Sequence, residues 1–171
     1  MFQAMRARAT AFLAHHWSRF SWFSAALMPL SALYALLMAA RSAAYRTGLL
    51  RAHRLPVPVV IVGNISVGGT GKTPLVLWLC DFLHARGYRP GIVSRGYGGK
   101  GGTRPVLPDS DPALTGDEPV LLARRIRAPV WIGRDRAAAA RALLRAHPDC
   151  DLIVSDDGLQ HLAMARDMEI A

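Results

Sequence analysis

The sequence predicts an α/β fold in which helices cover both faces of a parallel sheet, preceded by an N-terminal membrane-associated helix. Two observations indicate the sheet: short apolar runs recur along residues 55–171, and helix-like segments separate them. Strands that are apolar throughout are typical of parallel sheets, which are buried on both faces. A third observation, an uncharged stretch within a basic N-terminal segment, indicates the preceding helix.

The N-terminal segment is basic and apolar at once. Residues 1–54 hold seven Arg and no acid, whereas residues 55–171 hold 14 basic and 12 acidic residues, so most of the net charge of +9 lies in the first segment. Its run Phe20–Ala40 has no charged side chain over 21 residues (20 through 40 inclusive), which is long enough to cross a bilayer. This pairing favours a membrane surface over nucleic acid, and no nucleic-acid partner is expected.

How that helix meets the membrane stays open at this stage. Pro29 falls near its middle and Arg residues flank both sides, so the positive-inside rule gives no clear orientation. Three arrangements fit: an interfacial or partly inserted anchor, a true span, or a helix buried on its own protein. The segment Leu55–Pro58 then marks a boundary, since its two prolines bar a continuing helix. We therefore expect an anchoring segment over 1–54 and a folded domain over 55–171.

Within the folded domain, apolar runs and turn residues alternate. The expected strands are Val59–Val62, Gly91–Ser94, Ala128–Ile132, Leu152–Ser155 and the beginning of a fifth at Met168–Ala171; the expected helices are Thr73–Gly87, Glu118–Ile126 and Arg134–Ala146. The connection Arg95–Gly116 exceeds an ordinary loop and is either disordered or functional. Cys80 and Cys150 lie in apolar surroundings without metal-type spacing, so we expect reduced core thiols in a cytosolic compartment.

The strongest chemical signal is the sequence SVGGTGKT, which lies between an expected strand and an expected helix. Its glycines let backbone N–H groups point at phosphate oxygens, and the helix N-terminus adds its dipole. Lys72 would reach the β- and γ-phosphates of a nucleotide, and the Thr73 hydroxyl would ligate Mg²⁺. The pattern predicts a sheet of the P-loop NTPase type that binds nucleotide phosphates and Mg²⁺. Its nucleotide-binding residues are Ser66, Val67, Gly68, Gly69, Thr70, Gly71, Lys72 and Thr73.

Acidic residues follow two other expected elements. Asp156 and Asp157 come directly after the strand Leu152–Ser155, where P-loop enzymes hold Mg²⁺, although an Asx turn would also place Asp there. Asp117 stands at an expected helix start, where it is either an N-cap or a base that takes a proton from a substrate hydroxyl. Spacing alone leaves both interpretations open.

Four motifs occur in a fixed order behind the apolar helix: VGNISVGGTGKTP (Val62–Pro74), SRGYGG (Ser94–Gly99), GDEP (Gly116–Pro119) and SDDGLQH (Ser155–His161). In this order the chain resembles the tetraacyldisaccharide 4'-kinase family, which also tolerates a Ser at the position of Ser66. Members of this family transfer the ATP γ-phosphate to the 4'-hydroxyl of a tetraacyldisaccharide 1-phosphate. The product is lipid IVA, an intermediate of lipid A biosynthesis.

The resemblance implies roles for individual residues. It implies nucleotide and Mg²⁺ contacts at Ser66–Thr73, with Lys72 and Asp117 catalytic, Asp117 as the base, and Asp156 and Asp157 near Mg²⁺. It also implies contacts with substrate or phosphate from a second set: Arg95, Tyr97, Glu118 and His161. The expected partners are a lipid disaccharide and the cytoplasmic face of the bacterial inner membrane; no protein partner is assigned.

The family is roughly twice as long as this chain and places a His partner for the base in its C-terminal half, so we expect a chain truncated before that half. Two other functions remain open. A membrane-associated regulatory P-loop ATPase would carry Lys where this chain has Val67, and a GTPase would need an Asn-Lys-x-Asp motif, which is absent. A non-catalytic nucleotide-binding fragment is the other alternative.

Overall fold

The computed structural model describes residues 22–64, 71–99 and 102–171. Ser66–Thr70 of the expected nucleotide loop lie outside the described residues, as does the beginning of the expected membrane helix. The described residues fall into two compact units, one ending at Leu49 and the other comprising Leu50–Ala171.

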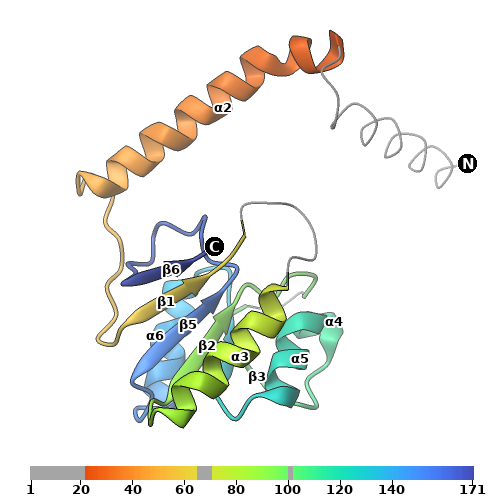
Figure 1. The fold of residues 1–171 in the computed structure, drawn as a ribbon, viewed down its shortest axis with the longest axis vertical. Helices are drawn as coiled ribbons and strands as arrows, with labels where there is room; N and C mark the ends of the chain where they lie inside the picture. The colour runs from red at the N-terminus through yellow and green to blue at the C-terminus, as the bar shows by residue number, and fades with distance from the viewer. Residues whose placement is uncertain (1–21, 65–70, 100–101) are drawn as a thin grey trace, which may run out of the picture. The chain divides into compact units, whose positions relative to one another are not determined.

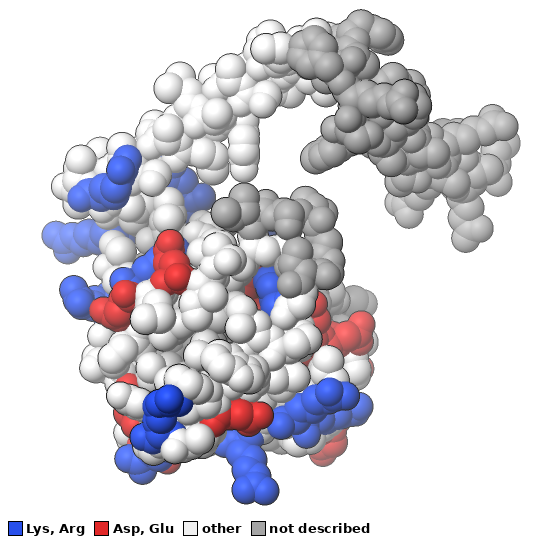
Figure 2. Space-filling model, in the orientation of Figure 1, with Lys and Arg blue, Asp and Glu red and all other residues white. Residues whose placement is uncertain are grey.

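The first unit contains helix α2, Trp22–Arg46, which passes through Pro29 (Figure 1). Its part Ala25–Arg46 is long and apolar enough to cross a membrane, and none of it is buried. Large apolar side chains are exposed along it, among them Leu30, Leu33 and Leu36. Figure 2 accordingly shows an uncharged surface along most of the described helix.

The second unit is built on a six-stranded sheet in the order β3-β4-β2-β5-β1-β6. The strands are β1 Val59–Val62, β2 Pro90–Ser94, β3 Arg104–Val106, β4 Val130–Ile132, β5 Leu152–Asp156 and β6 Met168–Ile170. All neighbouring pairs are parallel except β3 with β4. The five strands expected from the sequence are therefore confirmed.

The sequence missed two elements within the connection Arg95–Gly116. This connection contains the antiparallel strand β3 and the short helix α4, Pro112–Thr115. The sheet is mostly parallel, as expected, but the sequence did not predict this antiparallel edge strand. The reason is physical: β3 has three residues, pairs on one side and includes Pro105, which an edge strand tolerates, so its sequence shows no strand pattern.

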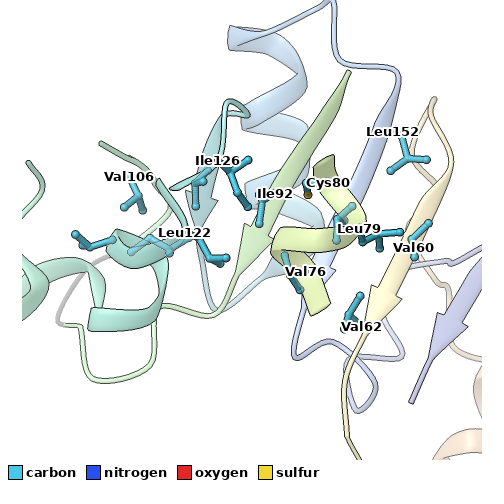
Figure 3. Packing of buried hydrophobic residues seen from close by; sticks show 14 residues of the cluster. Val60, Val62, Val76, Leu79, Cys80, Ile92, Val106, Leu122, Ile126 and Leu152 are labelled. Carbon is cyan, nitrogen blue, oxygen red and sulfur yellow. The ribbon is translucent and has the colours of Figure 1, made fainter. Parts of the chain in front are cut away.

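Helices cover both faces of the sheet, as expected (Figure 1). Helices α3, Lys72–Ala85, and α5, Asp117–Arg125, pack on one face, where Val76, Leu79 and Leu122 meet alternate strand residues (Figure 3). Helix α6, Arg136–Ala146, packs on the other through Leu143 and a row of alanines.

Both cysteines belong to this core. Cys80 and Cys150 are buried and free, as expected. Burial raises the pKa of the Cys80 thiol to about 12 and that of Cys150 to about 11, with nearby aspartates acting in the same direction. Both groups therefore stay protonated at neutral pH and serve as small apolar side chains.

The topology collects the polar motifs at one edge. Because β1, β2, β4 and β5 are parallel, their carboxyl ends meet at the same edge of the sheet, and α3, α5 and α6 begin near it. Register brings Val62, the last residue of β1, opposite Asp156, the last residue of β5. The nucleotide motif and the paired aspartates are thus placed on neighbouring strands.

Candidate functional site

Helix α3 begins at the Lys-Thr pair of the glycine-rich motif. Gly71 precedes it with φ 79, a left-handed conformation that favours glycine. The Lys72 ammonium donates to Oδ1 of Asp157 at 2.8 Å, and Thr73 is the next residue of the helix. The nucleotide motif and the end of β5 are therefore joined by an ion pair.

Asp156 is the buried member of the aspartate pair. It is 2% exposed, and the Ser94 hydroxyl, at the end of β2, donates to its Oδ2 at 3.5 Å. Burial, with repulsion from Glu118 and Asp157, raises the pKa of Asp156 to about 6, although Lys72 and the Ser94 bond act in the opposite direction. Its negative charge is thus poorly compensated, and a cation beside it would be stabilised.

Asp157 lies in different surroundings, although it is the next residue. It has a left-handed φ of 53 and its side chain is 54% exposed. The structure therefore divides the site into a buried side, Ser94 and Asp156, and an accessible side, Lys72, Asp117, Glu118 and Asp157.

Asp117 opens helix α5 without capping it. The cap position is Gly116, and no side-chain cap hydrogen bond is present there, so the N-cap interpretation of Asp117 is wrong. Gly116 has φ 88, and a Cβ there would lie 2.5 Å from the backbone oxygen of Tyr97. Only glycine satisfies both constraints. The two residues that follow it at the beginning of the helix, Asp117 and Glu118, are exposed.

The turn after β2 packs against this same place. Gly96 and Gly98 have left-handed φ values of 70 and 84, and the Gly99 N–H donates to the Gly96 oxygen at 3.1 Å. The turn leaves Arg95 exposed and the Tyr97 side chain 82% exposed, beside the beginning of α5. This part of the long connection is ordered by backbone packing.

The model of the family described as tetraacyldisaccharide-1-P 4'-kinase, LpxK, matches residues 23–171. The chain belongs to the tetraacyldisaccharide 4'-kinase family. The expectation drawn from the four motifs is confirmed.

Individual relatives agree with the assignment to this kinase family. A tetraacyldisaccharide 4'-kinase of Aromatoleum aromaticum is 60% identical over 156 residues, which cover 91% of this chain and 46% of the relative. One from an Azoarcus species is 58% identical over 146 residues, or 85% of this chain and 43% of the relative. A crystal structure of an "apo" form of LpxK from Aquifex aeolicus in complex with ATP superposes with a TM-score of 0.77 at 36% identity, covering 85% of this chain and 47% of that one. The chain spans about half the length of these relatives.

Two arginines that sequence reasoning missed, the buried Arg136 and the half-buried Arg166, hold backbone groups next to the site in this member of the 4'-kinase family. Arg136, the first residue of α6, is 6% exposed and donates through Nη2 to the backbone oxygen of Asp157 at 2.8 Å. Burial, with repulsion from Arg95, lowers its pKa, while Asp157 and Asp156 raise it. A cation in a first helical turn opposes the helix dipole, and this was the signal available in the sequence. The second arginine, Arg166, donates to the backbone oxygens of Leu159 and His161, in the loop that follows β5.

The predicted site residues are brought together to different degrees. Lys72, Asp156, Asp157 and Glu118 interact directly or through their charges. His161 shares a loop with Asp157 and is half-buried. Among the described residues, no three His, Cys, Asp or Glu side chains form a metal cage. A P-loop Mg²⁺ needs one or two carboxylates, a hydroxyl and phosphate oxygens, and Asp156 and Thr73 fit that donor set.

Proposed function

We propose that this chain supplies the ATP-binding and proton-accepting residues of a lipid kinase. The reaction would transfer the γ-phosphate of ATP to the 4'-hydroxyl of tetraacyldisaccharide 1-phosphate, giving lipid IVA. One observation carries the proposal: Lys72, at the start of α3, pairs with Asp157 beside the buried Asp156, and the charge of Glu118 in the GDEP motif repels that carboxylate. Because Ser94 of the SRGYGG motif also donates to Asp156, residues of all four family motifs converge on one point.

The nucleotide would be held by the glycine-rich motif Ser66–Thr73. Lys72 would exchange its partner Asp157 for β- and γ-phosphate oxygens; because Asp157 is 54% exposed, breaking this pair costs at most about 1 kcal/mol. Mg²⁺, when bound, supplies positive charge to the phosphate oxygens. Thr73 and Asp156 would hold it, with Asp157 beside them.

The acceptor hydroxyl would be activated at the beginning of α5. Asp117 makes no capping bond and is exposed, so its carboxylate is available to accept the proton of the 4'-hydroxyl. Arg95 and Tyr97 belong to the turn whose backbone packs against Gly116, the residue before Asp117. With Glu118 and His161 they form the proposed set of contacts to the lipid disaccharide or its phosphates.

A kinase assay separates this proposal from its rivals. A version of the chain extended to the length of the relatives would be given γ-labelled ATP, with and without the disaccharide acceptor. We expect label in the lipid, only with acceptor, and none with Lys72→Ala. ATP hydrolysis indifferent to the acceptor would instead indicate a regulatory ATPase. Nucleotide binding without turnover would indicate a non-catalytic module.

We also propose that residues 1–54 anchor the kinase domain, residues 55–171, to the cytoplasmic face of the bacterial inner membrane. The exposed apolar side chains of α2 and the arginines that follow it support this, because lipid would cover the former and attract the latter. Deleting 1–54 should leave a soluble domain that no longer sediments with anionic vesicles. High salt should strip the intact chain only in part, since apolar burial persists; complete release would indicate purely electrostatic attachment.

A further inference from the structure

Arg166 lies just before β6, and its guanidinium reaches back to the loop that follows β5. Its Nη1 donates to the backbone oxygen of Leu159 at 3.1 Å and its Nη2 to that of His161 at 3.0 Å. Nη1 also contacts Glu169 Oε1 at 2.6 Å. The side chain is 13% exposed, whereas that of Glu169 is 51% exposed, so the two carbonyl bonds are the shielded ones.

The loop held in this way, Asp157–His161, carries the accessible aspartate. Arg136 holds the opposite end through the Asp157 oxygen, and inside the loop the His161 N–H donates to the Gly158 oxygen at 2.9 Å. The Leu159 side chain lies so close to Gly63 that a Cβ there would be 2.5 Å from it. Gly63 directly follows β1 and precedes the glycine-rich motif. A shift of this loop would therefore move Asp157 and would also disturb the approach to the nucleotide motif.

The backbone beside Arg166 is itself fixed. The Ala165 N–H donates to the His53 oxygen at 3.0 Å, and the Asp167 N–H donates to the Val59 oxygen at 2.9 Å. The Asp167 side chain accepts from the Val59 N–H at 2.9 Å. Arg166 therefore starts from a point anchored to β1 and the segment before it. Because the backbone on both sides of Arg166 is fixed, the hydrogen bonds of its guanidinium restrain the loop carbonyl groups that accept them.

We propose that Arg166 is a positioning residue for phosphoryl transfer. It acts by fixing the carbonyl groups of Leu159 and His161, which holds the loop and keeps Asp157 in place beside Asp156. The proposal rests on the kinase function proposed above. It assigns Arg166 no contact with substrate: its effect passes through the loop, where misplacement of reacting groups by about 1 Å costs roughly 10²-fold in rate.

Three variants in the extended protein test this role. Arg166→Met removes both carbonyl bonds and should lower kcat by roughly tenfold or more, with a smaller change in KM for ATP. Arg166→Lys can reach one carbonyl at a time and should restore part of the loss. Glu169→Gln is the matched control, since it weakens the exposed ion pair and leaves the carbonyl bonds in place; its kcat should stay within about twofold of the unsubstituted protein.

A second measurement does not depend on catalysis. In the ligand-free 171-residue chain, amide hydrogen exchange across Asp157–His161 should be about tenfold faster in Arg166→Met and unchanged in Glu169→Gln. If the Met variant does not fold, the Lys variant decides by the same two readouts. A folded variant with normal kcat overturns the proposal, whether or not its loop exchanges faster. Absence of transfer by the unsubstituted protein would instead reject the kinase function itself.

Discussion

The buried and accessible sides of the site differ although they meet at one peptide bond. Asp156 is 2% exposed and accepts a hydrogen bond from Ser94, and burial, with repulsion from Glu118, raises its pKa to about 6. Asp157 is half exposed and pairs with Lys72. The alternation of a strand sends successive side chains to opposite faces, and the left-handed turn at Asp157 ends that strand.

The two sides of the site therefore differ in what they contribute to the stability of the empty protein. A buried carboxylate with incomplete compensation stores unfavourable energy in the empty protein, which a bound cation relieves. An exposed ion pair contributes little free energy, so its members exchange partners easily. Substitutions on the buried side should therefore change stability and its pH dependence, whereas those on the accessible side should change turnover with little effect on stability.

The largest effect is expected at Lys72, on the accessible side. Lys72→Ala in the extended protein should reduce phosphoryl transfer by roughly 10³-fold or more, because a cation is lost where charge develops in the transition state. Its melting temperature should stay close to that of the unsubstituted protein. Single-turnover rates check the predicted loss of transfer, and thermal unfolding checks the melting temperature. A near-normal kcat would show that Lys72 takes no part in the reaction.

Asp117→Asn is a second test of the accessible side, where turnover should change more than stability. Asparagine cannot accept the hydroxyl proton, so kcat should fall by roughly 10²-fold or more while ATP affinity is nearly unchanged. Because Asp117 makes no capping bond, the loss of stability should stay below about 1 kcal/mol, the part owed to the helix dipole. If the variant turns over within about threefold of the unsubstituted protein, Asp117 is not the base, and Asp156 or Asp157 would be tested next.

On the buried side, Asp156→Asn should stabilise the ligand-free chain at neutral pH by about 2 to 3 kcal/mol, since its pKa rises from 3.8 to about 6 on folding. Between about pH 4 and pH 6 the folded protein binds more protons at this group than the unfolded chain, so its contribution to stability falls as pH rises and then levels off. The Asn variant should lack this slope.

Urea unfolding across this pH range measures the effect. Glu118, Lys72, Asp157 and Arg136 also act on or near the group, and all four remain in the variant. Equal slopes for the variant and the unsubstituted chain would show that burial does not penalise the Asp156 charge.

The smallest effect is expected one residue further on. Asp157→Asn breaks the pair with Lys72, yet the free energy of unfolding should change by less than about 1 kcal/mol, and less still at high salt. It is the matched control for Asp156→Asn in the same unfolding experiment. A loss above about 2 kcal/mol would place Asp157 with the buried side and end the distinction.

Much of the fold could be predicted because its signals are local. The apolar runs of β1 and β5 and the Gly-Lys-Thr start of α3 lie within a few consecutive residues, so each indicates its own element. The strand β3 could not be predicted, since three residues that include a proline carry no period. The N-cap interpretation of Asp117 also failed: it needed φ at Gly116, which packing against Tyr97 determines.

By itself, the sequence determined the kinase family, the order of the motifs and the edge of the sheet where they meet, because parallel strands joined by helices place all their carboxyl ends together. Only the tertiary structure decided which aspartate is buried, that Lys72 pairs with Asp157, and that Arg136 and Arg166 hold the loop between them. These contacts join residues distant in the chain or depend on burial and on one left-handed residue. A local sequence pattern cannot show which way a side chain points relative to helices and strands that are distant in the chain.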